Sequence, residues 1–88
     1  MKVKTITLEG ETGFIAKITR DYPTEGLECI MCEITDKNGE RISVHHVSKN
    51  DREDQYSMAQ CIQYHLDGCR GTNSMIHDYF RYIIFFAD

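Results

Sequence analysis

The side chains with the strongest chemical potential in this chain are four cysteines and four histidines. Cys29 and Cys32 have the C-x-x-C spacing found in zinc sites and redox centres. The residues around them predict a β-strand, in which positions three apart point to opposite faces, whereas a redox pair belongs at a helix N-terminus. We therefore interpret them as two separate, reduced strand cysteines.

A second set of cysteine and histidine lies on a predicted helix. Cys61, His65 and Cys69 recur every four residues on one face, and at about 1.5 Å per residue the three span about 12 Å, too far for one ion. His65 with one cysteine could supply two ligands, and His45 or His46 could add a third. The central place of His65 in an apolar stripe instead favours a core histidine, so we expect no metal and no cofactor.

Catalytic motifs are missing from the sequence. It contains no G-x-S-x-G, no phosphate-binding loop and no H-E-x-x-H. A single domain of 88 residues also has little room for both a core and a pocket that buries a ligand. We expect that the protein is not an enzyme, although a small enzyme remains the third hypothesis.

Acidic side chains are concentrated in one segment. The whole chain has a formal net charge of −4, and residues 21–40 contain six acids against Lys37 alone. Such a segment favours a basic partner and speeds encounter with it. The candidate partner-binding residues are Asp21, Glu25, Glu28, Glu33, Asp36 and Glu40. The simpler alternative is a solvated hairpin whose carboxylates keep the protein soluble.

Basic side chains near the N-terminus carry the alternative hypothesis, nucleic-acid binding. Lys2, Lys4, Lys17 and Arg20 give the first predicted hairpin a small positive excess. The sequence has no long basic stripe and no RNA-binding signature, which makes binding of phosphates a weaker hypothesis.

The function we expect is that of a small protein-binding module that acts by occupying a partner with a basic surface. One small acidic domain without a catalytic motif has the general character of phage proteins, and a phage-type inhibitor of a bacterial enzyme or defence complex is the concrete version. No apolar stretch reaches the length of a membrane span or a signal peptide. We therefore expect a cytoplasmic location, in the host if the protein is phage-encoded.

The first half of the chain predicts four strands in one domain covering residues 1–88. Alternating apolar residues mark strands over about 2–8, 14–19, 27–35 and 40–47, separated by glycine-containing turns. Lys37-Asn38-Gly39 fits either a two-residue turn or a three-residue turn with a bulge. We prefer the second, because it pairs Cys32 with Val44 and Ile34 with Ile42 on an apolar inner row that ends at His46. It also turns Glu28 and Glu33 outward with Met31.

The second half predicts an amphipathic helix and a hydrophobic C-terminal segment. Ser48, Asn50 and Asp51 are candidate N-caps, with Asn50 and Glu53 resembling a capping box. The helix carries an apolar stripe from Met58 to Cys69 and ends at Gly68 or Gly71.

The C-terminal run Tyr82-Ile83-Ile84-Phe85-Phe86 favours a buried strand by propensity after a short helix from Met75. A continuous helix from Met75 onward is the alternative. The fold class is therefore α+β, a four-stranded antiparallel meander covered by one helix and a hydrophobic strand or helix. If that last segment is buried within the chain the protein is a monomer, which we favour; if it is exposed, a homodimer follows.

Overall fold

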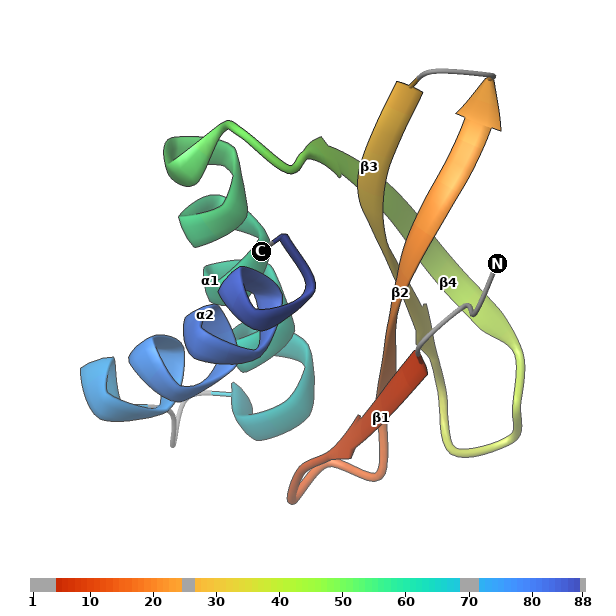
Figure 1. Ribbon diagram of the computed structural model, residues 1–88. Coiled ribbons are helices and arrows are strands. Elements are labelled where there is room, and N and C mark those ends of the chain that lie inside the picture. Colours follow the sequence, from red (N-terminus) through yellow and green to blue (C-terminus); the bar gives the residue numbers. More distant parts are fainter. Residues whose placement is uncertain (1–4, 25–26, 69–71, 88) are drawn as a thin grey trace.

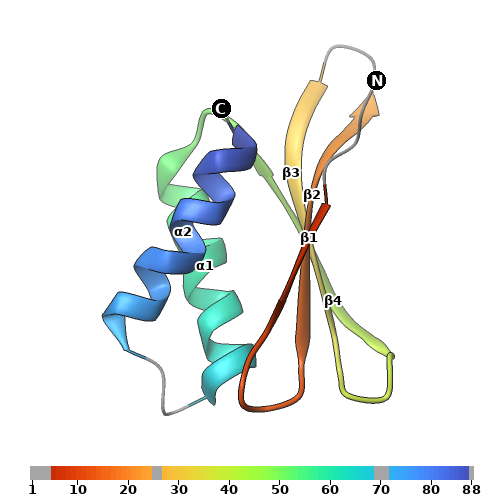
Figure 2. The same ribbon diagram turned by 60° about the horizontal axis from the view of Figure 1, so that its bottom comes forward.

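The computed structural model describes residues 5–24, 27–68 and 72–87. Four strands, β1 (Thr5–Glu9), β2 (Ile15–Thr24), β3 (Leu27–Thr35) and β4 (Arg41–Ser48), form an antiparallel sheet in the order β1-β2-β3-β4. Two helices follow, α1 (Arg52–Asp67) and α2 (Asn73–Ala87), and both lie against the same face of the sheet (Figures 1 and 2). The predicted α+β class and four-stranded meander are confirmed.

The core lies between that covered face, here called the inner face, and the two helices. Strand alternation sends one set of apolar side chains inward, and the buried sheet residues Ile18, Ile30, Cys32 and Ile34 all pack there. The helices contribute Met58, Ala59, Ile62, Leu66, Ile83 and Phe86 to the same cluster. Neither of the described helices lies on the opposite side of the sheet, here called the outer face (Figure 2).

Helix α1 is fixed at its start by an aspartate. The Asp51 side chain accepts a hydrogen bond from the backbone N–H of Asp54 at 3.1 Å, so Asp51 is the N-cap and the predicted Asn50 capping box is wrong. The observed N-cap lies one residue after the predicted capping box. The two positions are hard to distinguish from sequence, because any short polar side chain just before the helix can take this role. The predicted end at Gly68 is confirmed, since the Gly68 N–H bonds the Tyr64 carbonyl.

The turn between β1 and β2 holds the other end of α1 against the sheet. Thr12 donates from its backbone N–H to the Leu66 carbonyl at 3.1 Å and from its hydroxyl to the His65 carbonyl at 2.7 Å. These bonds satisfy carbonyls that the last turn of a helix leaves without an intrahelical partner. Gly10 permits the approach, because a Cβ atom there would lie 2.3 Å from the Leu66 carbonyl oxygen.

The C-terminal segment is a helix, so the preferred strand over Tyr82–Phe86 is wrong and the continuous helix is correct. Ile76, Phe80, Ile83 and Ala87 recur at helical spacing and all touch the core. In a strand, Ile83 and Phe85 would share a face, whereas Ile83 is buried and Phe85 is exposed. Burial of an amphipathic face therefore overrides the β-propensity of these aromatic and β-branched residues.

The β3–β4 hairpin has the predicted turn but not the predicted register. Gly39 adopts a φ of 85°, and the Asp36 N–H bonds the Glu40 carbonyl around the residues 37–39, as expected for the three-residue turn. An irregularity between Ile34 and Thr35 then shifts the strands by one residue, leaving Ile42 as the extra residue of a bulge.

The pairs beyond that bulge are Cys32 with His45 and Ile34 with Ser43, so the predicted pairing with Val44 and Ile42 is wrong. The one-residue slip exchanges the two faces of β4. His45, not His46, lies on the inner face. Glu28 alternates with buried Ile30 and Cys32 and also lies on the inner side, which corrects the prediction that it points outward with Met31.

Candidate functional site

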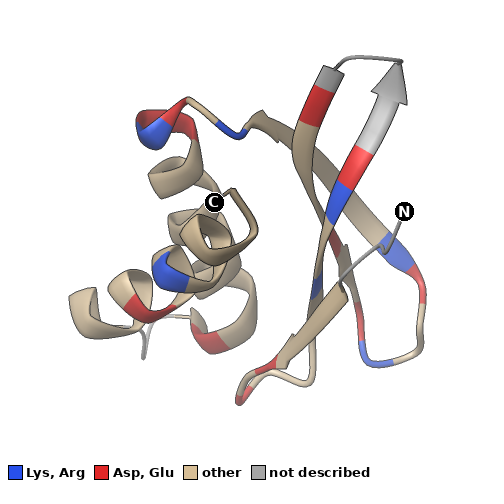
Figure 3. Ribbon diagram, in the orientation of Figure 1, with Lys and Arg blue, Asp and Glu red and all other residues tan. Residues whose placement is uncertain are grey.

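The acidic residues predicted to bind a partner are spread over the molecule and are mostly engaged with its own groups. Glu28 contacts Lys49 at 2.6 Å and Arg20 at 3.4 Å, and Glu33 contacts Arg41 at 3.6 Å. Asp36 accepts from the backbone N–H groups of Asn38 and Glu40, both at 2.9 Å, and so holds the hairpin turn. Glu40 is exposed at the hairpin tip, and Glu25 lies outside the described residues. Figure 3 shows red and blue segments on both the strands and the helices.

The basic residues of the alternative hypothesis are also divided. Lys2 and Lys4 lie outside the described residues. Lys17 is on the outer face opposite Glu33, whereas Arg20 is on the inner side and donates to the Ala87 carbonyl at 3.2 Å. Arg20 therefore joins the sheet to the end of α2.

The described cysteines Cys29 and Cys32 lie on opposite faces of β3, as predicted from strand alternation. Cys32 is fully buried in the core. Burial raises the pKa of its thiol to about 12, with smaller contributions from Cys61 and Glu33. Such a thiol stays protonated at neutral pH and is a poor nucleophile.

On the inner face, Cys61 of α1 meets two histidines. Its Sγ lies 3.6 Å from His45 Nε2 and 3.6 Å from His65 Nδ1, which brings together residues that the sequence offered as metal ligands. The same His65 Nδ1 is 2.8 Å from the Cys61 carbonyl oxygen and donates its proton there, so this nitrogen is committed to the helix backbone. Burial raises the pKa of the Cys61 thiol. Cys69 lies outside the described residues.

A hollow of about 250 Å³ opens beside this inner group, between β4 and α1. His45, Ser57, Met58 and Cys61 are among the residues that line it. A Cys–His contact in a hollow is the arrangement of a thiol nucleophile, but the raised pKa of Cys61 acts against formation of the thiolate. The simpler interpretation is that the hollow is a gap in the packing of α1 against β4.

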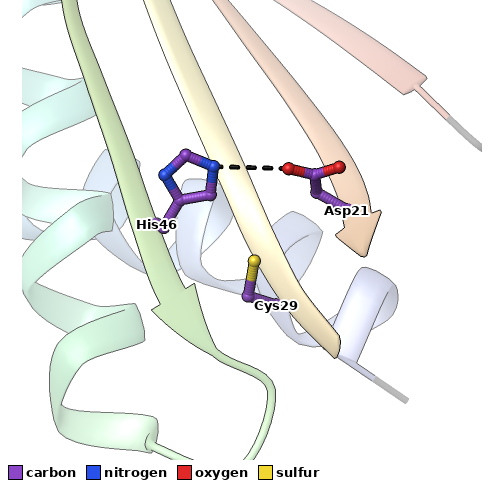
Figure 4. A group of neighbouring side chains, drawn as sticks. All are labelled: Asp21, Cys29 and His46. Carbon is purple, nitrogen blue, oxygen red and sulfur yellow. Dashed lines mark hydrogen bonds and ion pairs between the residues drawn. The ribbon is translucent and has the colours of Figure 1, made fainter. Parts of the chain in front are cut away.

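On the outer face, Asp21, Cys29 and His46 converge from three adjacent strands. His46 Nε2 lies 3.3 Å from Asp21 Oδ2, and one ligand atom from each of the three residues lies within 4.8 Å of the others. Figure 4 shows the Cys29 sulfur on β3 between the imidazole on β4 and the carboxylate on β2. Burial, and to a smaller extent the Asp21 carboxylate, raise the pKa of the Cys29 thiol.

Sequence patterns did not predict this group, for three structural reasons. Asp21 and Cys29 are cross-strand partners only because β2 and β3 pair in the observed register. His46 reaches the outer face only because of the bulge at Ile42, whereas the register predicted from the sequence puts it on the inner face. The predicted second strand also ends at residue 19, whereas β2 continues to Thr24 and so includes Asp21. The remaining signal was a thiol and an imidazole on two consecutive predicted strands.

An apolar groove runs between the edge strand β1 and helix α2. It has a volume of about 330 Å³ and is lined by Ile6, Arg81, Tyr82 and Phe85. Phe85 is 64% exposed and Tyr82 is 41% exposed, whereas their neighbours Ile83 and Phe86 are buried. The predicted C-terminal hydrophobic segment is thus divided between a buried side and an exposed side.

Comparison of the chain with protein family models, with curated proteins and with solved structures finds no match. Neither helix in the described ranges is long and apolar enough to cross a membrane.

Proposed function

We propose that this protein is a small protein-binding module that acts by occupying a partner, with the groove between β1 and α2 as its contact surface. The observation that carries the proposal is the exposure of Phe85 and Tyr82 beside this groove. Exposed aromatic side chains clustered around an apolar groove are characteristic of protein interfaces. Large aromatic residues also supply most of the binding energy where such interfaces have been dissected.

The position of the groove adds to this argument. β1 is the terminal strand of the sheet, and a terminal strand offers backbone hydrogen-bonding groups along its outer side. Ile6 of this strand lines the groove, so a partner segment lying along β1 can place apolar side chains against Phe85. Strand addition combined with an adjacent side-chain pocket is a recurring mode of peptide recognition.

Charge gives this module a preferred kind of partner. The net charge of −4 attracts a protein with a basic surface over distances comparable to the Debye length. Asp36 and Glu40 stand at the hairpin tip, where they can steer the encounter without entering the groove. A cytoplasmic inhibitor of a bacterial enzyme or defence complex, of the kind that phages encode, is the concrete form of the proposal.

Two aromatic substitutions of matched exposure test the contact surface. Phe85→Glu places a charge in the groove, and Tyr64→Glu changes a side chain that is 67% exposed on α1 and does not line the groove. Both variants should fold, because neither residue is buried. We expect bacterial-lysate partners captured by the wild type to be retained by Tyr64→Glu and lost by Phe85→Glu. Equal capture by both variants would show that the groove is not the contact surface.

Association kinetics of the captured complex test the role of charge. Replacing Glu33 and Glu40 by lysine leaves Glu28 with its two cationic neighbours in place, and also the Asp36 carboxylate that holds the hairpin turn. The association rate should fall at low salt, while the dissociation rate should change little. Recovery of nucleic acid instead of protein, with an affinity that falls steeply with salt, would favour the alternative function.

A further inference from the structure

The outer-face group of Asp21, Cys29 and His46 has the composition of a metal site. It combines a carboxylate, a thiol and an imidazole, the three side-chain types that bind Zn²⁺ in proteins. The three residues come from β2, β3 and β4, so the sheet itself holds them rather than a loop. Asp21 and Cys29 are direct cross-strand partners, and His46 is the diagonal neighbour of Cys29 across β4.

The geometry points to a binding site for a thiophilic divalent cation, such as Zn²⁺, held by Asp21 Oδ2, Cys29 Sγ and His46 Nε2. The existing separation of 3.3 Å between His46 Nε2 and Asp21 Oδ2 already suits such an ion. Two ligands about 2.05 Å from a tetrahedral zinc lie about 3.3 Å apart, so the cation can replace the hydrogen bond between these two side chains at their existing separation.

The charges of the group also match a divalent cation. An ionised carboxylate and a thiolate supply two negative charges, and a neutral imidazole supplies none, so the site with Zn²⁺ is neutral. A cation at this point reverses the unfavourable interaction between the Asp21 carboxylate and the Cys29 thiolate. The Asp21 and His46 side chains are 38% and 45% exposed, which leaves an open side for a water molecule as fourth ligand.

The irregular strand geometry next to Asp21 supports a binding site at this position. The pairing of β2 with β3 is irregular between Asp21 and Thr24, directly after the proposed ligand. Bulges of this kind re-aim side chains and are common beside functional sites. The bulge at Ile42 acts similarly on β4, because it turns His46 to the outer face.

The inner-face group of Cys61, His45 and His65 is the natural competitor, and its geometry is poorer. The His65 nitrogen nearest the Cys61 sulfur already donates to a backbone carbonyl, so metal binding there would break a helix contact. Within the described ranges, the outer-face group brings three ligand atoms mutually within 4.8 Å. The inner group, with Cys61 and His65 on α1 and His45 on β4, therefore provides a control that also combines a thiol with imidazoles.

Cobalt(II) titration of the reduced full-length chain tests the proposal. Tetrahedral cobalt bound to a thiolate gives an intense charge-transfer band, and Zn²⁺ should displace it. We expect the band with the wild type and with Cys61→Ser and His45→Asn, and its loss with Cys29→Ser. Asp21→Asn and His46→Asn should each weaken cobalt binding by more than about tenfold, since even residues that only orient metal ligands have effects of 10–100-fold.

Circular dichroism of each variant separates loss of the site from loss of the fold, and Cys29→Ala replaces Cys29→Ser if the serine variant unfolds. A band that is absent from the wild type at millimolar cobalt would overturn the proposal. So would a band that survives Cys29 substitution, or one that folded Cys61→Ser abolishes, because either result places the cation elsewhere.

Discussion

The two faces of the β3–β4 hairpin carry nearly the same reactive residues in different surroundings. Cys32 and His45 point inward, and Cys29 and His46 point outward. Inside, the cysteine is sealed in the core and the histidine contacts Cys61 of α1. Outside, the cysteine lies beside a carboxylate and the histidine is partly open to solvent. Strand alternation, together with the bulge at Ile42, places these residues on opposite faces.

The two faces of this small sheet therefore have different roles. The inner face contributes apolar area to the core, so its residues are constrained by packing. Neither α1 nor α2 covers the outer face, so among the described residues its side chains are constrained mainly by their neighbours on adjacent strands. Stability should therefore respond strongly to inner-face changes, and ligand binding should respond to outer-face changes.

Removing the cover of the inner face should have the largest effect. Deletion of residues 82–88 takes away Ile83 and Phe86, which are buried against the sheet, and the Ala87 carbonyl that accepts from Arg20. We expect this truncated chain to lose cooperative thermal unfolding by circular dichroism, because each buried side chain contributes about 1.5–3 kcal/mol. The point substitution Phe85→Ala, on the exposed side of α2, should keep the transition. A folded, monomeric truncated protein would contradict this role for α2.

Adjacent residues of β3 provide the second contrast. Ile30→Ala leaves a cavity at a fully buried inner position and should lower the free energy of unfolding by about 2–5 kcal/mol. Met31→Ala, on the outer face, should lower it by less than about 1 kcal/mol. Urea denaturation of the two variants measures both values. Similar losses would mean that the outer face is packed as tightly as the inner one.

Several parts of this structure follow from local patterns in the sequence. The glycine turn at 39, the alternation of Ile30, Cys32 and Ile34, and the end of α1 at Gly68 depend on neighbouring residues, and they were predicted. The helical C-terminus was the less favoured alternative, because propensity and amphipathic spacing disagree there. Side-chain burial decides such cases, and burial depends on the whole fold.

The outer-face group could not be predicted for a different reason. It requires the registers of two strand pairs at once, and the bulge at Ile42 reverses the face on which His46 lies. A single extra residue in a strand has no strong local signature in the sequence. It nevertheless moves every side chain beyond it to the opposite face of the sheet. The partner-binding role predicted for the acidic residues stays a prediction, to be tested by association rates.

The protonation of Cys32 gives a third contrast, through pH. Its thiol has a pKa of about 12 in the folded chain against an ordinary value of 9.0, so the folded state favours the neutral form. This stabilisation is complete below pH 9 and is lost as the pH rises towards 12. The difference in unfolding free energy between the wild type and Cys32→Ala should be constant below pH 9 and shrink above it. A difference that stays constant above pH 9 would show that the fold does not shield the thiol from water.

The smallest expected effect is an increase in stability at an imperfect inner position. Ser43 lies opposite buried Ile34, and its hydroxyl oxygen is buried without a hydrogen-bond partner in the described part of the chain. Burying an unsatisfied hydroxyl costs free energy, so Ser43→Ala should raise the free energy of unfolding by about 1 kcal/mol.

Ser48 is the matched outer-face serine, and its hydroxyl accepts from the Asn50 N–H at 3.2 Å. Ser48→Ala should therefore lower stability by about 0.5–1 kcal/mol, since it removes a bond that is made. Chemical denaturation of both variants gives the two signs directly, and a loss of stability with Ser43→Ala would show that its hydroxyl is satisfied in solution.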